Sequence, residues 1–164
     1  MLTKQVTIRN DPAPFRGLVA GIVAGLVASL AMNLFQKAWA STLPMPSSCD
    51  DPATVKAAQK VSRAATGEYF AKSDKAEAGN AVHYLFGAML GGAYGVIAEY
   101  RPEVTMGYGA LFGLSAASFD ELGVPAAGLS GPPTDFRAST HAYGLASHLV
   151  FGGVTEATRK LARG

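Results

Sequence analysis

Residues 17–35 read GLVAGIVAGLVASLAMNLF, residues 86–98 read FGAMLGGAYGVIA, and glycine recurs at four-residue spacing in both stretches. The glycines at this spacing are Gly17, Gly21, Gly25, Gly87, Gly91 and Gly95. In a water-soluble helix, an interior glycine costs about 1 kcal/mol relative to alanine. In a bilayer, a glycine strip lets two helix backbones approach closely and gain dispersion contacts. The spacing therefore predicts a polytopic membrane protein with closely packed helices.

Four stretches with few or no charged side chains are long enough, or nearly so, to cross a bilayer. A hydrocarbon core of about 30 Å needs about 20 helical residues, with about 17 as the lower limit. The predicted spans are residues 17–37, 78–98, 104–122 and 138–157. A re-entrant segment is the alternative for the third and shortest of them. The sequence thus predicts an all-α fold, in which residues 1–164 form one membrane domain, a compact bundle of about four transmembrane helices.

The loop between the first two spans, residues 38–77, carries much of the charge of the chain. Asp51 as N-cap and Pro52 at the first helical position predict a helix that ends near Gly67. Its periodicity is amphipathic, with an apolar side that includes Val55 and an opposite basic side. The basic residues are Lys56, Lys60 and Arg63. This helix either packs across the ends of the bundle as a solvated or interfacial element, or contacts lipid head groups or a partner subunit.

The two later connections differ in composition. Residues 99–103 form a minimal link between the second and third spans, which predicts a helical hairpin with antiparallel neighbours. Residues 120–137 are rich in glycine and proline, so we expect no regular helix there.

Orientation follows from the basic residues that flank the spans. Both ends of the chain carry a basic excess: Lys4, Arg9, Arg16, Arg159, Lys160 and Arg163. The loop of residues 120–137 has only Arg137 against three carboxylates. Four spans place both termini on one side, so we expect both to be cytoplasmic in a bacterial inner membrane. The six basic residues from Lys37 to Lys75, in and beside the first loop, oppose this assignment, although the length of the loop and its acidic residues weaken their weight.

Several classes of function lack the residues that they need. The net charge is only +2 and the basic residues form no cluster with aromatic ones, so we expect no nucleic-acid partner. The single cysteine, Cys49, excludes an intramolecular disulfide and a multi-cysteine metal site. No nucleophile–base pair, phosphate loop, nucleotide fingerprint or H-E-x-x-H motif is present. We therefore expect a protein that is not an enzyme, with no catalytic residue and no metal ligand.

The third predicted span also has small residues at four-residue spacing. Gly109 and Gly113 are four residues apart and Ala117 follows at the same spacing. Together with the six glycines of the first two spans, Gly109 and Gly113 are predicted to pack helix against helix. A tight bundle of short spans leaves little room for a wide pore.

Ionisable residues at membrane depth are costly and call for a functional hypothesis. His83, His141 and His148 all fall in predicted spans, and Glu121 and Glu156 stand at span boundaries. A hydrogen bond to a neighbouring helix, or for Glu156 an ion pair with a nearby basic residue, is the simplest role. A proton or cation path through Glu121, His141 and His148 is one alternative. Another is a b-type haem held between His83 and His148.

A short pattern occurs twice in the chain. His83 to Gly87 and His148 to Gly152 both follow H-x-x-F-G, 65 residues apart. The shared histidine makes this faint repeat worth testing as a sign of internal duplication.

The half of the chain after Gly107 resembles the uncharacterised YagU-type inner-membrane protein family of bacteria. The resemblance rests on Phe112-Gly113, on an acidic-Pro-Gly-Leu loop and on an H-x-Y-G start to the last span. The loop and span residues are Glu121, Pro125, Gly128, Leu129, Pro132, Pro133, His141, Tyr143 and Gly144. The resemblance implies a multi-span inner-membrane protein with no established reaction and supplies no catalytic residues.

These observations leave three functions open. The first is a small non-catalytic accessory or assembly subunit of a larger membrane complex. The second is a small transporter or a protein that handles protons or other ions, and the third is an electron carrier with haem b. In each case we expect membrane lipid, and either other membrane subunits or further copies of the chain, as partners.

Overall fold

The computed structural model describes residues 11–42 and 50–163, and α- and 3-10 helices are the only regular elements in these residues. The prediction of an all-α fold is confirmed for this part of the chain. The helices are α1 (Pro14–Thr42), α2 (Ala53–Thr66), α3 (Lys75–Tyr100), α4 (Ala110–Ala126) and α5 (Ala138–Arg163), with the 3-10 turns η1 (Pro102–Thr105) and η2 (Pro133–Asp135). Cys49 and the basic residues Lys4 and Arg9 lie outside the described residues.

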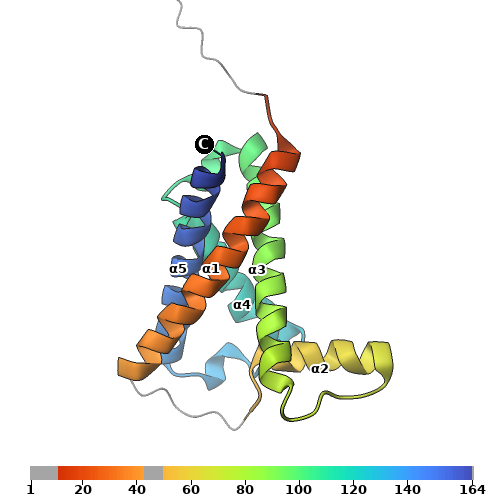
Figure 1. Ribbon diagram of the computed structural model, residues 1–164. Coiled ribbons are helices and arrows are strands. Elements are labelled where there is room, and N and C mark those ends of the chain that lie inside the picture. The colour runs from red at the N-terminus through yellow and green to blue at the C-terminus, as the bar shows by residue number, and fades with distance from the viewer. Residues whose placement is uncertain (1–10, 43–49, 164) are drawn as a thin grey trace, which may run out of the picture.

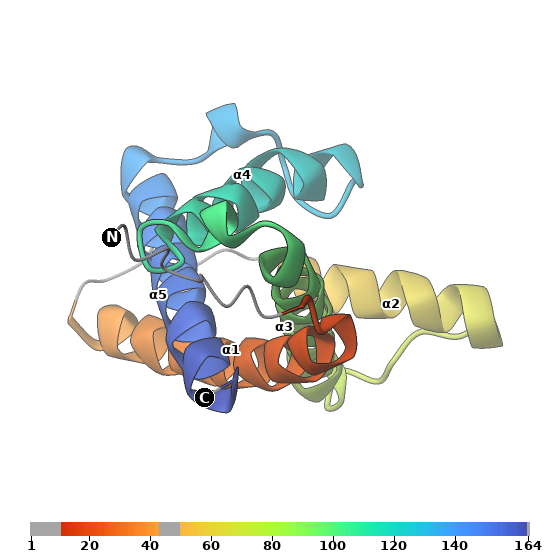
Figure 2. The same cartoon turned by 90° about the horizontal axis from the view of Figure 1, so that it is seen from above.

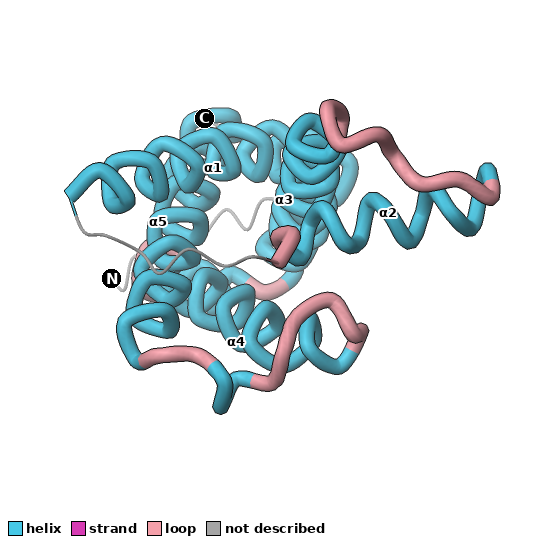
Figure 3. Tube along the Cα trace, turned by 90° about the horizontal axis from the view of Figure 1, so that it is seen from below, coloured by secondary structure: helices cyan, strands magenta, loops and turns pink. Residues whose placement is uncertain are grey.

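Four long helices form a bundle, and α2 lies across one end of it (Figure 1). Helix α1 packs against both α3 and α5, and α4 packs against α5. Seen along the bundle, the four helices surround a common centre, and α2 projects away from it (Figures 2 and 3). We call the end where α1 begins and α5 finishes the terminal end, and the opposite end the α2 end.

Helix α1 buries its small residues and exposes its large apolar ones, which is the opposite of a water-soluble helix. Its buried positions hold only small residues and one methionine: Gly17, Ala20, Gly21, Ala24, Gly25, Ala28, Ser29 and Met32. Its large apolar residues are exposed: Leu18, Val19, Ile22, Val23, Leu26, Val27, Leu30 and Leu34. Soluble proteins bury large aliphatic residues first. The helix therefore gains little from hiding its aliphatic side chains and much from close backbone contact.

Two helices, α1 and α3, are long and apolar enough to cross a membrane, with mean hydropathies of 2.2 and 1.4 over 18-residue windows. This is fewer than the four spans that the sequence predicts. Helix α4 has 17 residues. Helix α5 has 26 residues but includes two histidines and Glu156, so its mean hydropathy is lower.

The third predicted span begins later than expected. The sequence predicts a helix from residue 104, but α4 begins at Ala110. The preceding Gly107, Tyr108 and Gly109 have φ angles of 69°, 54° and 84°, which a right-handed helix does not contain. The connection after Tyr100 is consequently longer than the predicted minimal link.

Two predictions of local structure are wrong. Helix α4 continues beyond the predicted span end at residue 122, from Gly123 to Ala126, where a non-helical loop was expected, because Pro125 lies in its last turn and disrupts little. The N-cap of α2 is Pro52, with no side-chain capping hydrogen bond, whereas Asp51 forms an ion pair with Lys75 at 2.6 Å. The predicted end of α2 is confirmed, since Gly67 adopts a φ of 80° and donates its N–H to the carbonyl of Arg63.

Candidate functional site

The contact between α1 and α3 is a backbone-to-backbone seam, which we call the glycine seam. A Cβ atom built on Gly21 would lie 2.1 Å from the carbonyl oxygen of Gly91, and one built on Gly25 would lie 2.0 Å from that of Gly87. Gly17 and Gly95 meet in the same way, one turn closer to the terminal end. No residue with a side chain fits at these positions without movement of a backbone.

Helices α4 and α5 also meet through glycine, but only toward the terminal end. A Cβ atom on Gly109 would lie 2.1 Å from the carbonyl oxygen of Gly152, and one on Gly113 would lie 2.5 Å from that of His148. Gly144, two turns earlier on α5 than Gly152, has nothing within 4 Å of its Cβ position. The two helices are therefore in backbone contact at one end and open at the other.

The open part of this pair holds a cavity of about 380 Å³. Its wall combines apolar residues of both helices with four ionisable side chains: Asp120, Glu121, His141 and His148. Helix α4 supplies the two carboxylates near its C-terminal end, and α5 supplies the two histidines from its first three turns. The structure thus brings together three of the predicted site residues, Glu121, His141 and His148, and adds Asp120.

Both histidines of this cavity have a partner for Nδ1. Nδ1 of His141 lies 2.6 Å from a carboxylate oxygen of Glu121, and both side chains are about two-fifths exposed. Nδ1 of His148 donates to the carbonyl oxygen of Gly144 at 2.8 Å, which leaves its Nε2 as the other ring position available to a ligand. His148 and Asp120 also interact electrostatically. The cavity therefore contains one histidine–carboxylate pair and a second histidine whose Nδ1 is engaged by the backbone.

His83 stands apart from the other histidines. It lies on α3 and does not line the cavity that His141 and His148 share. Its Nε2 is buried and makes no hydrogen bond to the described residues. Its ring interacts electrostatically with His148 and Asp120. The glycines that end the two H-x-x-F-G patterns pack against different helices, Gly87 against α1 and Gly152 against α4. A haem between His83 and His148 stays a hypothesis, which a Soret band in purified protein would reveal.

Glu156 lies in a second polar group, near the terminal end. Its side chain is 1% exposed and accepts hydrogen bonds from the hydroxyl of Tyr94, at 2.8 Å, and from Nε of Arg159, at 2.8 Å. Lys160 adds an ion pair at 3.4 Å. The carboxylate raises the pKa of Arg159 above its usual value, because the hydrogen bond to Glu156 favours the charged guanidinium. These contacts match the ion pairing considered for Glu156 from the sequence.

A further ion pair joins the ends of three helices. Glu99, whose side chain is 5% exposed, pairs with Nε of Arg163 at 2.6 Å, and it also accepts the backbone N–H of Ala13 at 3.1 Å. The sequence placed Glu99 directly after a predicted span but did not predict its contacts with Arg163 and Ala13. Tyr94 was missed for the same reason, since the carboxylate that it contacts is 62 residues away along the chain.

The two polar groups are separated by packed apolar side chains. Tyr94 stacks on Phe112 with ring centroids 4.3 Å apart, and Phe112 in turn contacts Phe151 at 5.7 Å. Phe151 belongs to a core cluster with Ala28 and Met32 of α1. Along α5, this layer lies between His148 and Glu156, so it divides the acid–histidine cavity from the buried ion pairs.

Residues 11–42 and 50–163 contain no group of three His, Cys, Asp or Glu side chains arranged to hold a metal ion. The cavity between α4 and α5 therefore offers pairs of polar groups rather than a closed ligand set.

The profile of DUF1440, described as a protein of unknown function, matches residues 38–157. This match covers well over half of the chain. The chain belongs to the DUF1440 family. No curated protein and no solved structure matches it. The DUF1440 match begins at the end of α1 and includes α2, α3, α4 and most of α5, so it contains both the H-x-x-F-G repeat and the acid–histidine cavity.

Proposed function

We propose that this DUF1440 protein is an integral protein of the bacterial inner membrane and serves as a non-catalytic accessory or assembly subunit of a larger membrane complex. The resemblance to YagU-type inner-membrane proteins supports the location. In this proposal, α4 and α5 cross the membrane together with α1 and α3, because α5 packs against α1 and α4 packs against α5. Both termini then lie in the cytoplasm.

The exposed faces of the helices support membrane embedding. Large apolar residues are exposed on all four long helices, including Leu30, Met89, Leu111 and Leu149. In water such a surface favours aggregation, whereas in a bilayer it faces lipid or another subunit. Aromatic residues stand near both ends of the bundle, with Trp39 against Tyr143 at the α2 end. Tyr and Trp are typical of membrane–water interfaces.

The apolar layer through the middle of the bundle is the observation that carries the proposed role. A conduit needs polar groups or water from one end to the other. Here Tyr94, Phe112 and Phe151 lie between the cavity at the α2 end and the ion pairs near the terminal end. The glycine seam closes the contact between α1 and α3 as well. A rigid bundle with a blocked centre suits a scaffold better than a channel.

The proposal is tested on protein expressed at its native level by two measurements. They are alkaline washing of the membranes and photo-cross-linking from a residue on the outer face of a helix. We expect the protein to stay in membranes after alkaline carbonate washing. We also expect a photo-reactive residue at Leu30 of α1 or at Met89 of α3 to give a discrete protein adduct at one position and lipid adducts at the other. Release by carbonate contradicts membrane embedding. Lipid adducts alone at every outer position contradict the role as a subunit.

A second function is favoured by the acid–histidine cavity, namely the handling of protons or small cations. Glu121 and His141 form its one direct ion pair among the described residues. If this function is correct, purified protein in liposomes that contain a pH-sensitive dye will conduct protons, and Glu121→Gln will remove the flux. Flux that depends on Glu121 would displace the scaffold proposal, because it requires a path through the central apolar layer.

A further inference from the structure

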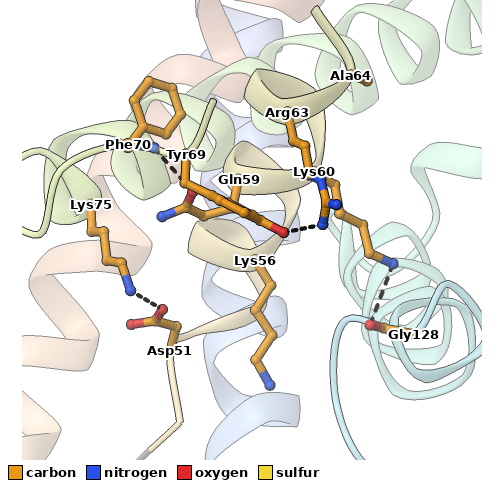
Figure 4. Close-up of a pocket in the computed structure, with 10 residues that line it drawn as sticks. All are labelled: Asp51, Lys56, Gln59, Lys60, Arg63, Ala64, Tyr69, Phe70, Lys75 and Gly128. Atoms are coloured by element: carbon orange, nitrogen blue, oxygen red, sulfur yellow. Dashed lines mark hydrogen bonds and ion pairs between the residues drawn. The ribbon is translucent and has the colours of Figure 1, made fainter. Parts of the chain in front are cut away.

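A second surface cavity lies beside α2, outside the four-helix bundle. Its volume is about 890 Å³, and α2 and the segment that follows it supply most of its wall (Figure 4). Four of the residues that line it are basic: Lys56, Lys60, Arg63 and Lys75. We call it the α2 cavity.

The α2 cavity is held open by contacts between α2 and its surroundings. Gln59 accepts the backbone N–H of Phe70 at 3.1 Å, and Arg63 donates to the hydroxyl of Tyr69, so the chain after α2 folds back along the helix (Figure 4). Lys60 donates to the carbonyl oxygen of Ala127 at 2.7 Å. The cavity is therefore framed by α2, by its own return segment and by the end of α4.

The charge of the α2 cavity is only partly neutralised. Asp51 pairs with Lys75 at 2.6 Å, and Asp50, beside the cavity, pairs with Lys56 at 3.3 Å. Lys60 and Arg63 bond to a carbonyl and to a phenol hydroxyl, neither of which carries a negative charge. Two cationic charges thus remain without a carboxylate in the cavity, which favours an anionic ligand.

The position of α2 indicates that the anionic ligand belongs to the surface of the membrane. Helix α2 lies crosswise at one end of the bundle (Figure 1), and its inner face packs Val55 against Gly79 at the start of α3. Exposed apolar residues accompany the basic ones: Val61, Tyr69 and Phe70. A crosswise helix with basic and apolar residues side by side is typical of elements that lie in the head-group region of a bilayer.

We propose that the α2 cavity binds the phosphate of an anionic phospholipid head group, with Lys60 and Arg63 as its main contacts and Tyr69 and Phe70 beside the glycerol and the first carbons of the acyl chains. This inference rests on the proposed membrane location. Lys56 and Lys75, each paired with a carboxylate, contribute long-range attraction. A lipid fits better than free phosphate because the cavity is large, open and partly apolar.

The proposal is tested by calorimetric titration of purified full-length protein in a zwitterionic detergent. The ligands are a water-soluble short-chain phosphatidylglycerol, the matching phosphatidylcholine and inorganic phosphate. We expect phosphatidylglycerol to bind at least tenfold more tightly than phosphatidylcholine, and inorganic phosphate not to bind at low millimolar concentration. Lys60→Gln combined with Arg63→Gln removes the two cationic charges that face no carboxylate in the cavity and weakens phosphatidylglycerol binding about tenfold or more.

A matched control removes the same two charge types from the same end of the bundle. Lys37→Gln combined with Arg137→Gln alters residues that do not line the α2 cavity, and it leaves binding within about twofold. Circular dichroism and size-exclusion profiles confirm that both double variants are folded.

Three outcomes overturn the proposal. They are equal binding of the two lipids, equal loss of affinity in the two double variants, and binding of inorganic phosphate as tight as that of phosphatidylglycerol. An adduct from α2 to a protein, with no preference for phosphatidylglycerol, assigns the cavity to a partner subunit instead. Protein that withstands carbonate washing but shows no lipid preference disproves this inference alone, whereas release by carbonate disproves the membrane location as well.

Discussion

The α1–α3 pair and the α4–α5 pair use the same residue type and reach different results. In the glycine seam, three successive turns place glycine against glycine, from Gly17 with Gly95 to Gly25 with Gly87. In the α4–α5 pair, glycine contact stops after Gly113, and Gly144 faces open space. The space is lined by carboxylates and histidines. The two helix backbones therefore stay in contact only where both helices have glycine at facing positions. Where one helix has no glycine, polar side chains line the space between them.

The largest effect is expected from Gly91→Leu in the glycine seam. A Cβ atom at residue 91 would lie 2.4 Å from the carbonyl oxygen of Gly21 and 2.7 Å from the Cα atom of Gly25. Small-to-large changes in packed sites usually cost about 1–3 kcal/mol. Here the obstruction is backbone on both sides, so we expect loss of the folded, monodisperse protein in detergent. Gly144→Leu is the matched control and should leave the thermal midpoint nearly unchanged. Equal midpoints for the two variants would remove the distinction between the two pairs.

An intermediate effect is expected from Glu156→Gln. The change removes the negative charge that Arg159 and Lys160 share and disturbs the hydrogen bond from Tyr94. Hydrogen bonds to charged groups contribute about 1.5–3 kcal/mol, and loss of one buried partner costs more. We expect a loss of about 2 kcal/mol or more in the free energy of unfolding, measured by denaturation in detergent. A change of less than about 0.5 kcal/mol would show that the buried ion pairs contribute little.

The smallest effect is expected from Glu121→Gln, which is the same chemical change in the open part of the α4–α5 pair. Glu121 and His141 are both about two-fifths exposed, and exposed ion pairs contribute about 0–1 kcal/mol. The free energy of unfolding should fall by less than about 1 kcal/mol in the same assay. If Glu121→Gln lowered the free energy of unfolding as much as Glu156→Gln does, the ion pair in the cavity would be as well shielded from solvent as the ion pairs at the terminal end.

Sequence periodicity predicted much of the helical architecture but not all of its boundaries. The strip from Gly17 to Gly25 and the apolar run around Gly91 placed α1 and α3, because glycine spacing and hydropathy are local properties. The start of α4 was missed because a left-handed Tyr108 is set by its neighbours rather than by its type. The helix through Pro125 was missed because a proline in a last turn removes few hydrogen bonds.

The candidate site was predictable in part. Glu121, His141 and His148 stood out as ionisable residues in or beside apolar stretches, and they line one cavity. Asp120 was not among the predicted site residues, although it lines the same cavity. The partners Tyr94 and Arg163 were not predicted, since Glu156 and Glu99 reach them across 62 and 64 positions of the chain. Contacts of that kind depend on how the helices pack, which residue type and spacing do not specify.

Helix α1 packs against both α3 and α5, and this has a consequence for biosynthesis. Its glycines meet α3, which follows after a single loop, while Ala28 and Met32 pack with Phe151 of α5. The first pairing needs only the first 100 residues to be synthesised. The second must await α5, because α5 follows α2, α3 and α4 along the chain. During translation, one side of α1 therefore remains uncovered until α5 is synthesised, and a nascent chain stopped after α3 would present that surface to whatever membrane protein lies beside it.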